Sequence, residues 1–348
     1  MTAKRSILLL RMAAVSLLCL VLGSCGSLGY YTQSVVGHSK MMLARKPITD
    51  VLKTATGDQQ RRLQMTLDIR RFAVEKLSLP DNASYSQYVE LNREYPVWSV
   101  VAADEFSLRA RQWCYPVIGC ASYRGYFSQK AAQKYEQGLL EKGLETTLGG
   151  VSAYSTLGWF DDPLTSAMLR YDDAFLVEIL FHELAHQQLY VNGNSKFNEA
   201  FATVVGEQGA VLWLQHQQPD LLKKYQQRLQ VRYDFFLLIQ DVKEKLKPIY
   251  SSSLSASTKR QQKAQALLLL EQDYVTLKQE QWQGIGWYDG WFKEPVNNAR
   301  LASIATYREL VPAFERLFEL CSRDYERFYA AVATQKNKGK AATVPEKC

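Results

Sequence analysis

Histidine is scarce in this sequence of 348 residues: there are four, and two of them, His182 and His186, stand four positions apart. A strong charge is also lacking, because a net charge of +7 is modest for this length. No nucleic-acid-binding motif accompanies it, and the two observations together argue against a nucleic-acid partner. Apolar residues make up 47% and charged residues 22%, as in ordinary globular proteins, so extensive disorder is excluded. The length allows one large domain or two closely packed ones.

The N-terminal segment lacks the roughly 20 consecutive apolar residues that a membrane-spanning helix needs. Its apolar stretch, Met12–Leu22, is shorter and follows a basic start, and this order predicts a signal peptide over residues 1–24. The run Leu22-Gly23-Ser24-Cys25 resembles a bacterial lipobox, in which the cysteine is lipidated and anchors the protein to a membrane. The alternative is an ordinary signal peptide with a chance cysteine. Gly26, in place of an aspartate, favours the outer membrane of the cell envelope, with the protein facing the periplasm.

Cysteine occurs at six positions, which agrees with export to an oxidising compartment. Cys114 and Cys120 enclose the turn-like segment Tyr-Pro-Val-Ile-Gly, and we predict a disulfide between them, with two buried free thiols as the alternative. Zinc binding by this pair is not expected, because no second Cys/His pair has matching spacing. We expect Cys321 in the core of an amphipathic helix and Cys348 unpaired at the end of a polar tail.

Hydrophobic periodicity predicts an α+β fold that is mainly α, with a small sheet early in the chain and helices later. Strands are expected within residues 95–107, 115–127 and 146–159, and helices over about 30–79, 128–142, 171–190, 197–215, 219–249, 259–283 and 295–334. The Lys-rich tail, residues 335–348, is expected to be disordered.

The segment Phe181–Gln187, which reads FHELAHQ, carries the most specific chemical signal. On a helix, residues four apart share a face, so His182 and His186 can point two imidazoles at one metal ion. Glu183 is rotated by about 100° and can reach a water molecule on that ion. The alternative is a pair of core histidines beside an ion-paired glutamate, but two histidines on an otherwise apolar stripe are costly to bury without a partner.

A catalytic zinc ion takes three protein ligands and keeps one open position. The turn-like residues 192–195 allow an antiparallel return, after which Asn198-Glu199-Ala200 begins a second helix and places Glu199 close to the ion. This arrangement resembles the gluzincins, whose third ligand is a Glu on the following helix. Two His and one Glu suit a single Zn²⁺. His216 and His38 are weaker candidates for the third ligand.

Glu207 lies two turns beyond Glu199 on the same helix face and is a candidate to hold a histidine ring by its other nitrogen. Here the chain departs from the thermolysin-like pattern, which has Asp four residues after the ligand Glu, whereas this chain has Thr203. That departure puts the role of Glu207 in doubt.

Beyond the motif, the chain resembles a bacterial family of predicted zinc aminopeptidases, most of which are lipoproteins. The matching segments are Tyr30–Ser34, Trp113–Cys120, Tyr123–Phe127, Ala153–Pro163, Phe181–Gln187, Phe197–Ala202 and Asn297–Leu301 with Tyr307. The resemblance implies a zincin-like, gluzincin-type metallopeptidase: a sheet-containing part with the metal-binding helices over residues 25–215, and a helical part over 216–334 that completes the cleft.

The expected reaction is hydrolysis of a peptide bond, with Glu183 as the general base and acid. Tyr154 and Tyr307 are candidates to stabilise the oxyanion, although either can be a packed aromatic. The stretch 153–160, with Ser155, is expected to be an edge strand that pairs with a peptide substrate. Asp161 and Asp162 either bind the substrate amine or begin a turn.

Two rival functions share the metal site. One is a zinc endopeptidase or oligopeptidase, which needs a cleft open at both ends. The other is a catalytically inactive envelope scaffold, which Glu183 argues against because a scaffold needs no base beside the ion. The sequence leaves the oligomeric state and the substrate side chain open.

Overall fold

The computed structural model describes residues 29–115, 119–153, 155–156 and 160–348. The expected signal segment, Cys25 and Tyr154 lie outside this part of the chain. Helices account for 61% of the structure and strands for 10%, so the expected class, α+β and mainly α, is confirmed. None of the helices that the structure describes is both long and apolar enough to cross a membrane.

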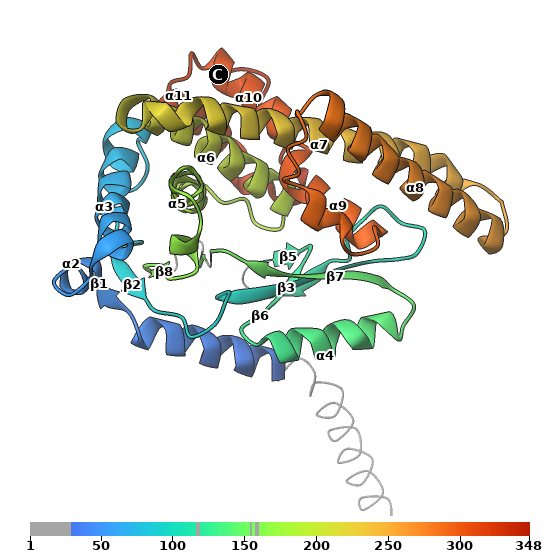
Figure 1. The fold of residues 1–348 in the computed structure, drawn as a ribbon, viewed down its shortest axis with the longest axis horizontal. Coiled ribbons are helices and arrows are strands. Elements are labelled where there is room, and N and C mark those ends of the chain that lie inside the picture. Colours follow the sequence, from blue (N-terminus) through green and yellow to red (C-terminus); the bar gives the residue numbers. More distant parts are fainter. Residues whose placement is uncertain (1–28, 116–118, 154, 157–159) are drawn as a thin grey trace, which may run out of the picture.

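A three-stranded antiparallel sheet lies at the centre of the fold (Figure 1). Its middle strand is β3 (Val97–Ala103), with β6 (Arg124–Tyr126) on one side and β7 (Glu145–Val151) on the other. Helix α4 (Gln129–Leu140) packs on one face of this sheet, and α9 (Asn298–Arg308) packs against β3 and β7 from the other side. On the described part of the chain β7 is therefore an edge strand.

Two short sheets flank the central one. The first joins β1 (Lys46–Pro47), β2 (Gln87–Val89) and β8 (Leu164–Thr165). The second is a hairpin of β4 (Trp113–Tyr115) and β5 (Gly119–Ala121), in which Cys114 lies opposite Cys120. These two cysteines form a disulfide across the hairpin.

Helices form the other layer, above the sheet in Figure 1. Helices α5 and α6 make an antiparallel hairpin, α7 and α8 make a second and longer one, and α10 and α11 pack beside α6. The helical elements are α2 (Ile48–Val51), α3 (Gly57–Leu77), α5 (Asp173–Gln188), α6 (Ser195–Gln217), α7 (Pro219–Ser251), α8 (Ala256–Glu280), α10 (Val311–Leu320) and α11 (Tyr325–Ala333), with 3₁₀ turns at Met168–Arg170, Asp289–Phe292 and Lys336–Ala341.

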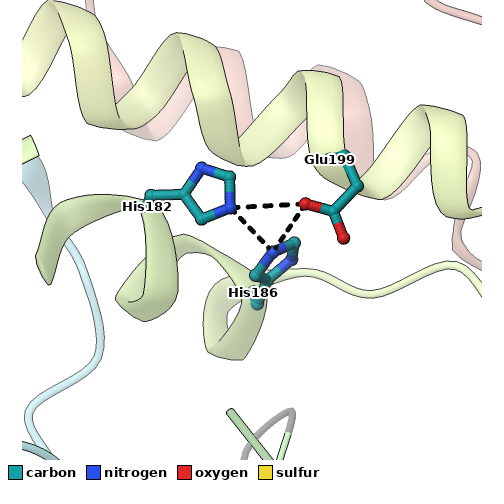
Figure 2. Close-up of side chains that lie close together, drawn as sticks. All are labelled: His182, His186 and Glu199. Atoms are coloured by element: carbon teal, nitrogen blue, oxygen red, sulfur yellow. Dashed lines mark hydrogen bonds and ion pairs between the residues drawn. The ribbon is translucent and has the colours of Figure 1, made fainter. Parts of the chain in front are cut away.

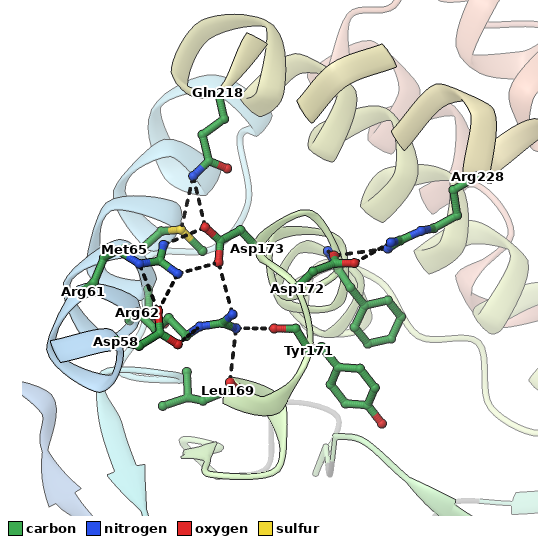
Figure 3. Close-up of polar contacts among 12 residues, drawn as sticks. Asp58, Arg61, Arg62, Met65, Leu169, Tyr171, Asp172, Asp173, Gln218 and Arg228 are labelled. Atoms are coloured by element: carbon green, nitrogen blue, oxygen red, sulfur yellow. Dashed lines mark hydrogen bonds and ion pairs between the residues drawn. The ribbon is translucent and has the colours of Figure 1, made fainter. Parts of the chain in front are cut away.

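The start of α5 is held by charged side chains from two other helices (Figure 3). Asp172 caps α5, accepting a hydrogen bond from the Phe175 backbone N–H at 2.9 Å, and also pairs with Arg228 of α7. Asp173 pairs with Arg61 of α3, with 2.6 Å between Nη1 and Oδ2. These contacts satisfy backbone donors and place acidic groups at the positive end of the helix dipole, so they fix where α5 begins.

The single helix expected over residues 30–79 is wrong. A helix over 29–43 ends before β1, and α2 and α3 follow as separate helices. Pro47 explains the first break, because a proline disfavours helical backbone at the preceding residue and has no N–H to donate. Gly57, at the start of α3, has a φ of +57°, a left-handed conformation that glycine adopts without strain.

The expected disorder of the tail is also wrong. Residues Lys336–Ala341 form a 3₁₀ turn, and Cys348 forms a disulfide with Cys321, which is fully buried. The amide of Asn194 donates a hydrogen bond to the Ala342 carbonyl at 3.2 Å, so the tail lies against the turn between α5 and α6. The tail composition is polar, but a covalent link and contacts to the core order it.

Candidate metal centre and adjoining cavity

The turn between α5 and α6 is closed by one buried amide. Asn198 is 1% exposed, and its side chain both accepts from the Val191 N–H and donates to the Val191 carbonyl, each at 2.8 Å. Asn194 caps α6 by accepting from the Phe197 N–H at 3.2 Å. These bonds fix the first turn of α6 against the end of α5, and Glu199 follows Asn198 directly. The antiparallel return predicted after His186 is therefore present.

A glycine allows the two helices to approach closely. A Cβ atom added at Gly206 would lie 2.9 Å from the Glu178 carbonyl oxygen and 3.2 Å from the Cβ of His182. Any larger residue would push α6 away from α5 at this point. The close approach brings the side chain of Glu199 within reach of both histidines.

His182, His186 and Glu199 point at one another from the two helices (Figure 2). The two Nε2 atoms lie 3.2 Å apart, and Oε2 of Glu199 lies 3.4 Å from that of His182 and 3.5 Å from that of His186. Two ligands each about 2.1 Å from a tetrahedral ion are about 3.4 Å apart, so the triangle has the size that such an ion requires. The three residues form a possible metal site, as predicted, and its ligand set of two nitrogens and one oxygen fits a divalent cation.

Burial and mutual charge shape the ionisation of this centre. Burial raises the pKa of Glu199, but the two histidines outweigh it and lower the pKa to about 2. Burial lowers the pKa of His182, but the hydrogen bond to Glu199 and the charge of Glu183 raise it overall. The Glu199 carboxylate is thus held ionised beside the His182 imidazole, which favours a positive charge. A bound cation would take the place of that charge and leave the imidazoles neutral.

Glu183 lies beside the triangle and is half-buried. Burial raises its pKa, while His182, His186 and a hydrogen bond from Ser155 act in the opposite direction without cancelling the rise. The same hydroxyl lies 3.3 Å from Oδ2 of Asp162, and its single proton can be donated to one of these two carboxylates at a time. Ser155 therefore lies between the Glu183 carboxylate and the loop that follows β7, and its expected role in binding substrate stays a prediction.

The strand expected over residues 146–159 ends earlier, at Val151 of β7. The described residues beyond Ser152 are not in a strand. Asp162 is fully buried and accepts hydrogen bonds from the Thr156 N–H at 2.9 Å and from Ser155. These side-chain bonds compete with strand pairing and fold the segment into a loop. The edge strand beside the site is therefore β7, and the described residues of the stretch 153–160 (Ala153, Ser155, Thr156 and Phe160) are not in a strand.

Neither aspartate expected to bind a substrate amine lies at the cavity. Asp162 is used inside the loop, and burial raises its pKa to about 6. Asp161 is exposed, and its carbonyl accepts from Arg45 at 3.2 Å. The structure favours the alternative, in which this pair shapes a turn. Tyr154 lies outside the described residues, and of Tyr307 only the backbone, in α9, is described.

A cavity of about 900 Å³ opens beside the metal centre, between the α5–α6 hairpin and the central sheet. Its walls include β7 from Thr147 to Val151, the N-terminal helix through Tyr30 and Ser34, and all four residues of the predicted centre. Two tyrosines that sequence reasoning missed, Tyr123 and Tyr190, line it as well. Tyr190 follows the end of α5 at Gln188, so helical spacing from His186 could not have placed it.

A network of buried charges borders the same cavity through Glu178, Arg232 and Arg308. Arg232 of α7 donates to Glu178 at 2.6 Å and to Glu207 at 2.7 Å, and Tyr225 donates to Glu178 at 2.8 Å. Arg308 of α9 also donates to Glu207. Glu207 thus binds two arginines and not a histidine ring, which corrects the candidate role. The Nδ1 atom of His186 is buried and has no partner among the described residues.

Comparison with known proteins adds one finding. A family model described as "Putative aminopeptidase" matches residues 29–343, most of the chain, and this description indicates a peptidase. The search of curated proteins gave no significant match, and neither did the search of solved structures.

Proposed function

The chain belongs to the family described as "Putative aminopeptidase", and from this membership and the metal site we propose that it is a zinc-dependent peptidase with a zincin-like fold, acting as an aminopeptidase. The observation that carries the proposal is the triangle of His182, His186 and Glu199, with Glu183 beside it in a cavity large enough for a peptide. The number and type of ligands leave one position of a tetrahedral zinc ion open for chemistry.

Zinc at this site would supply Lewis-acid chemistry, polarising a peptide carbonyl and acidifying a water molecule. The side chains of the protein would move the protons. Glu183 accepts the proton of the attacking water and later donates it to the leaving amine. The hydrogen bond from Ser155 orients the carboxylate for this transfer. Tyr123 and Tyr190 line the same cavity and are candidates to stabilise the oxyanion, besides Tyr154 and Tyr307.

The outer edge of β7, with which no strand of the described chain pairs, supports the binding of an extended peptide. Thr147, Gly149, Gly150 and Val151 line the cavity, and β7 pairs with β3 along its other edge. An extended substrate can add to such an edge through main-chain hydrogen bonds. Gly149 leaves open space where a side chain would lie, whereas the Tyr95 ring packs against Gly150, so room for a substrate backbone lies beside Gly149.

A second candidate, a zinc endopeptidase or oligopeptidase, is favoured by one observation. An aminopeptidase needs an acidic group for the substrate's free amine. The carboxylates that line the cavity in the described part of the chain are Glu178, Glu183 and Glu199. Glu183 and Glu199 belong to the centre, and Glu178 is already bonded to Tyr225 and Arg232.

Cleavage of a mixed peptide library by the purified protein, read by mass spectrometry, tests both proposals. We expect stepwise loss of N-terminal residues, abolished by a chelator and restored by zinc. Internal cuts with the same metal dependence would replace the aminopeptidase by an endopeptidase. No cleavage by protein that holds one zinc ion would leave a catalytically inactive scaffold.

We also propose that Cys25 carries a lipid that anchors the protein to the outer membrane on its periplasmic side. The lipobox-like residues before it support this proposal. Labelling cells with a radioactive fatty acid should mark the protein, and Cys25→Ser should abolish the label. A labelled Cys25→Ser protein, or an unlabelled wild-type protein, would contradict the proposal.

A further inference from the structure

Arg232 and Arg308, which both line the cavity, differ in how many of their N–H donors are paired. Arg232 donates through both Nη atoms, to Glu178 and Glu207. Arg308 donates through Nη1 alone, to Glu207. A guanidinium has five N–H donors, so most of those on Arg308 have no partner among the described residues. Its Nε is buried and is one of the unpaired atoms.

Arg308 combines burial with access to the cavity. The residue is 8% exposed, yet its side chain forms part of the cavity wall. Within the described chain, Glu207 is the one carboxylate that pairs with Arg308, and Glu207 is shared with Arg232. A buried donor left unpaired is costly, and a planar guanidinium is the group that best binds a carboxylate through two parallel hydrogen bonds.

We propose that Arg308 binds a carboxylate of the peptide substrate, supplied either by a nearby C-terminus or by an acidic side chain. This inference rests on the proposed peptidase function and names its substrate class: peptides with a carboxylate at a fixed distance from the cleaved bond. Arg232 and Glu207 act as positioning residues, because their ion pairs hold the Arg308 guanidinium at the cavity wall.

The geometry of α6 gives the length of such a peptide. Glu207, the partner of Arg308, follows the metal-site residue Glu199 by eight positions, which corresponds to about 12 Å along a helix. An extended peptide advances about 3.4 Å per residue. The carboxylate bound by Arg308 should therefore lie about three residues from the bond that is cleaved. A free C-terminus meets this condition in short peptides, and a Glu side chain meets it in longer ones.

Binding to zinc-loaded Glu183→Gln protein, measured by calorimetry, tests the inference without hydrolysis. The first arm compares tetra-alanine as the free acid with its C-terminal amide. The second compares two longer amidated peptides that differ by Glu or Gln at the third position after the cleaved bond. We expect the carboxylate-bearing member of at least one pair to bind about tenfold to a hundredfold more tightly. The arm that responds identifies the source of the carboxylate.

Adding Arg308→Gln should remove this preference, and Arg308→Lys should keep only part of it because lysine lacks the planar fork. Arg300→Gln is the matched control: Arg300 is also on α9, bonds to the Trp291 carbonyl and does not line the cavity. The carboxylate preference of the Arg300→Gln variant should equal that of the parent protein. Melting temperatures verify that each variant is folded, and the comparison of acid with amide in the parent protein needs no arginine variant.

Equal binding within both pairs would overturn the inference, as would a preference that survives Arg308→Gln. Hydrolysis by the wild-type protein, measured separately, distinguishes this failure from failure of the peptidase. Cleavage without a carboxylate preference would contradict the carboxylate subsite at Arg308 and support the peptidase function. A carboxylate preference without cleavage would support the subsite in a protein that binds peptides but does not cleave them. If the protein neither bound nor cleaved peptides, both the subsite and the peptidase function would be overturned.

Discussion

Helices α5 and α6 carry the metal centre and also supply the two carboxylates of a second cluster, the arginine network, and the two clusters are built in opposite ways. In the metal centre, the ligand atoms of His182, His186 and Glu199 lie close together and face one point. In the arginine network, Glu178 and Glu207 face Arg232 and Arg308, so each buried negative charge has a positive partner. Each carboxylate of the network pairs with at least one arginine, whereas in the described part of the chain the carboxylate of the metal centre pairs with the two histidines and with no arginine or lysine.

This difference separates two roles. A cluster of two imidazoles and a carboxylate without arginine or lysine partners is suited to a cation and to chemistry. A charge-balanced network with spare N–H donors is suited to holding structure and recognising an anion. Substitutions should therefore affect metal content at one cluster and stability or peptide preference at the other.

Removal of a metal ligand should have the largest effect. His186→Ala leaves two ligands, and we expect less than one tenth of the wild-type zinc content, measured by mass spectrometry of the metal, with peptidase activity at background. His216→Gln is the matched control, because His216 is exposed near the end of α6. It should keep full zinc content. Normal zinc content in His186→Ala would show that the ion is held elsewhere.

Glu183→Gln should separate chemistry from metal binding. The amide keeps the size of the side chain but cannot accept a proton, so the turnover rate should fall by about 10²- to 10⁴-fold. Zinc content and melting temperature should stay at wild-type values. The measurement is single-turnover cleavage of the best library peptide, and a rate within threefold of wild type would rule out Glu183 as the base.

Glu207→Gln should break the arginine network while sparing the metal. Its side chain is 3% exposed and faces two arginines, and loss of one partner of a buried ion pair costs about 3–5 kcal/mol. Urea unfolding should show this loss of stability with one zinc ion still bound. Glu309→Gln is the control, since its pair with Lys196 is exposed and should contribute about 0–1 kcal/mol. Equal effects of the two changes would contradict the comparison.

Gly206→Ala should have the smallest effect and touch both clusters. The new methyl group meets the Glu178 carbonyl and the His182 Cβ, and overpacking of this kind costs about 1–3 kcal/mol. We expect lower stability together with weaker zinc affinity, measured by competition with a chelating dye. Gly138→Ala on α4 has nothing within 4 Å of the added Cβ and should be neutral or stabilising. Unchanged zinc affinity in Gly206→Ala would mean that α5 and α6 can move apart at this point without disturbing the metal site.

The metal centre could be predicted from the sequence because its geometry is local. His182 and His186 share a helix face by spacing alone, and a short turn returns the chain to Glu199. The order of most helices and strands followed from hydrophobic periodicity in the same way. The breaks at Pro47 and Gly57 also have local causes, but the apolar periodicity across them hid the interruption.

The arginine network could not be predicted, because its members come from four helices and are up to 130 positions apart, from Glu178 to Arg308. Only the packing of α7 and α9 against the α5–α6 hairpin brings them together. The Cys321–Cys348 disulfide is a similar case, since a polar tail gave no sign that it returns to the core. Asp162 was read as a site residue because sequence does not show whether a carboxylate is buried in its own loop.

The most direct test of the account is diffraction from crystals of zinc-loaded protein, collected on both sides of the zinc absorption edge. The account predicts one anomalous peak, about 2.1 Å from Nε2 of His182, Nε2 of His186 and a carboxylate oxygen of Glu199. No peak there, or a single peak bound by other residues, would contradict it.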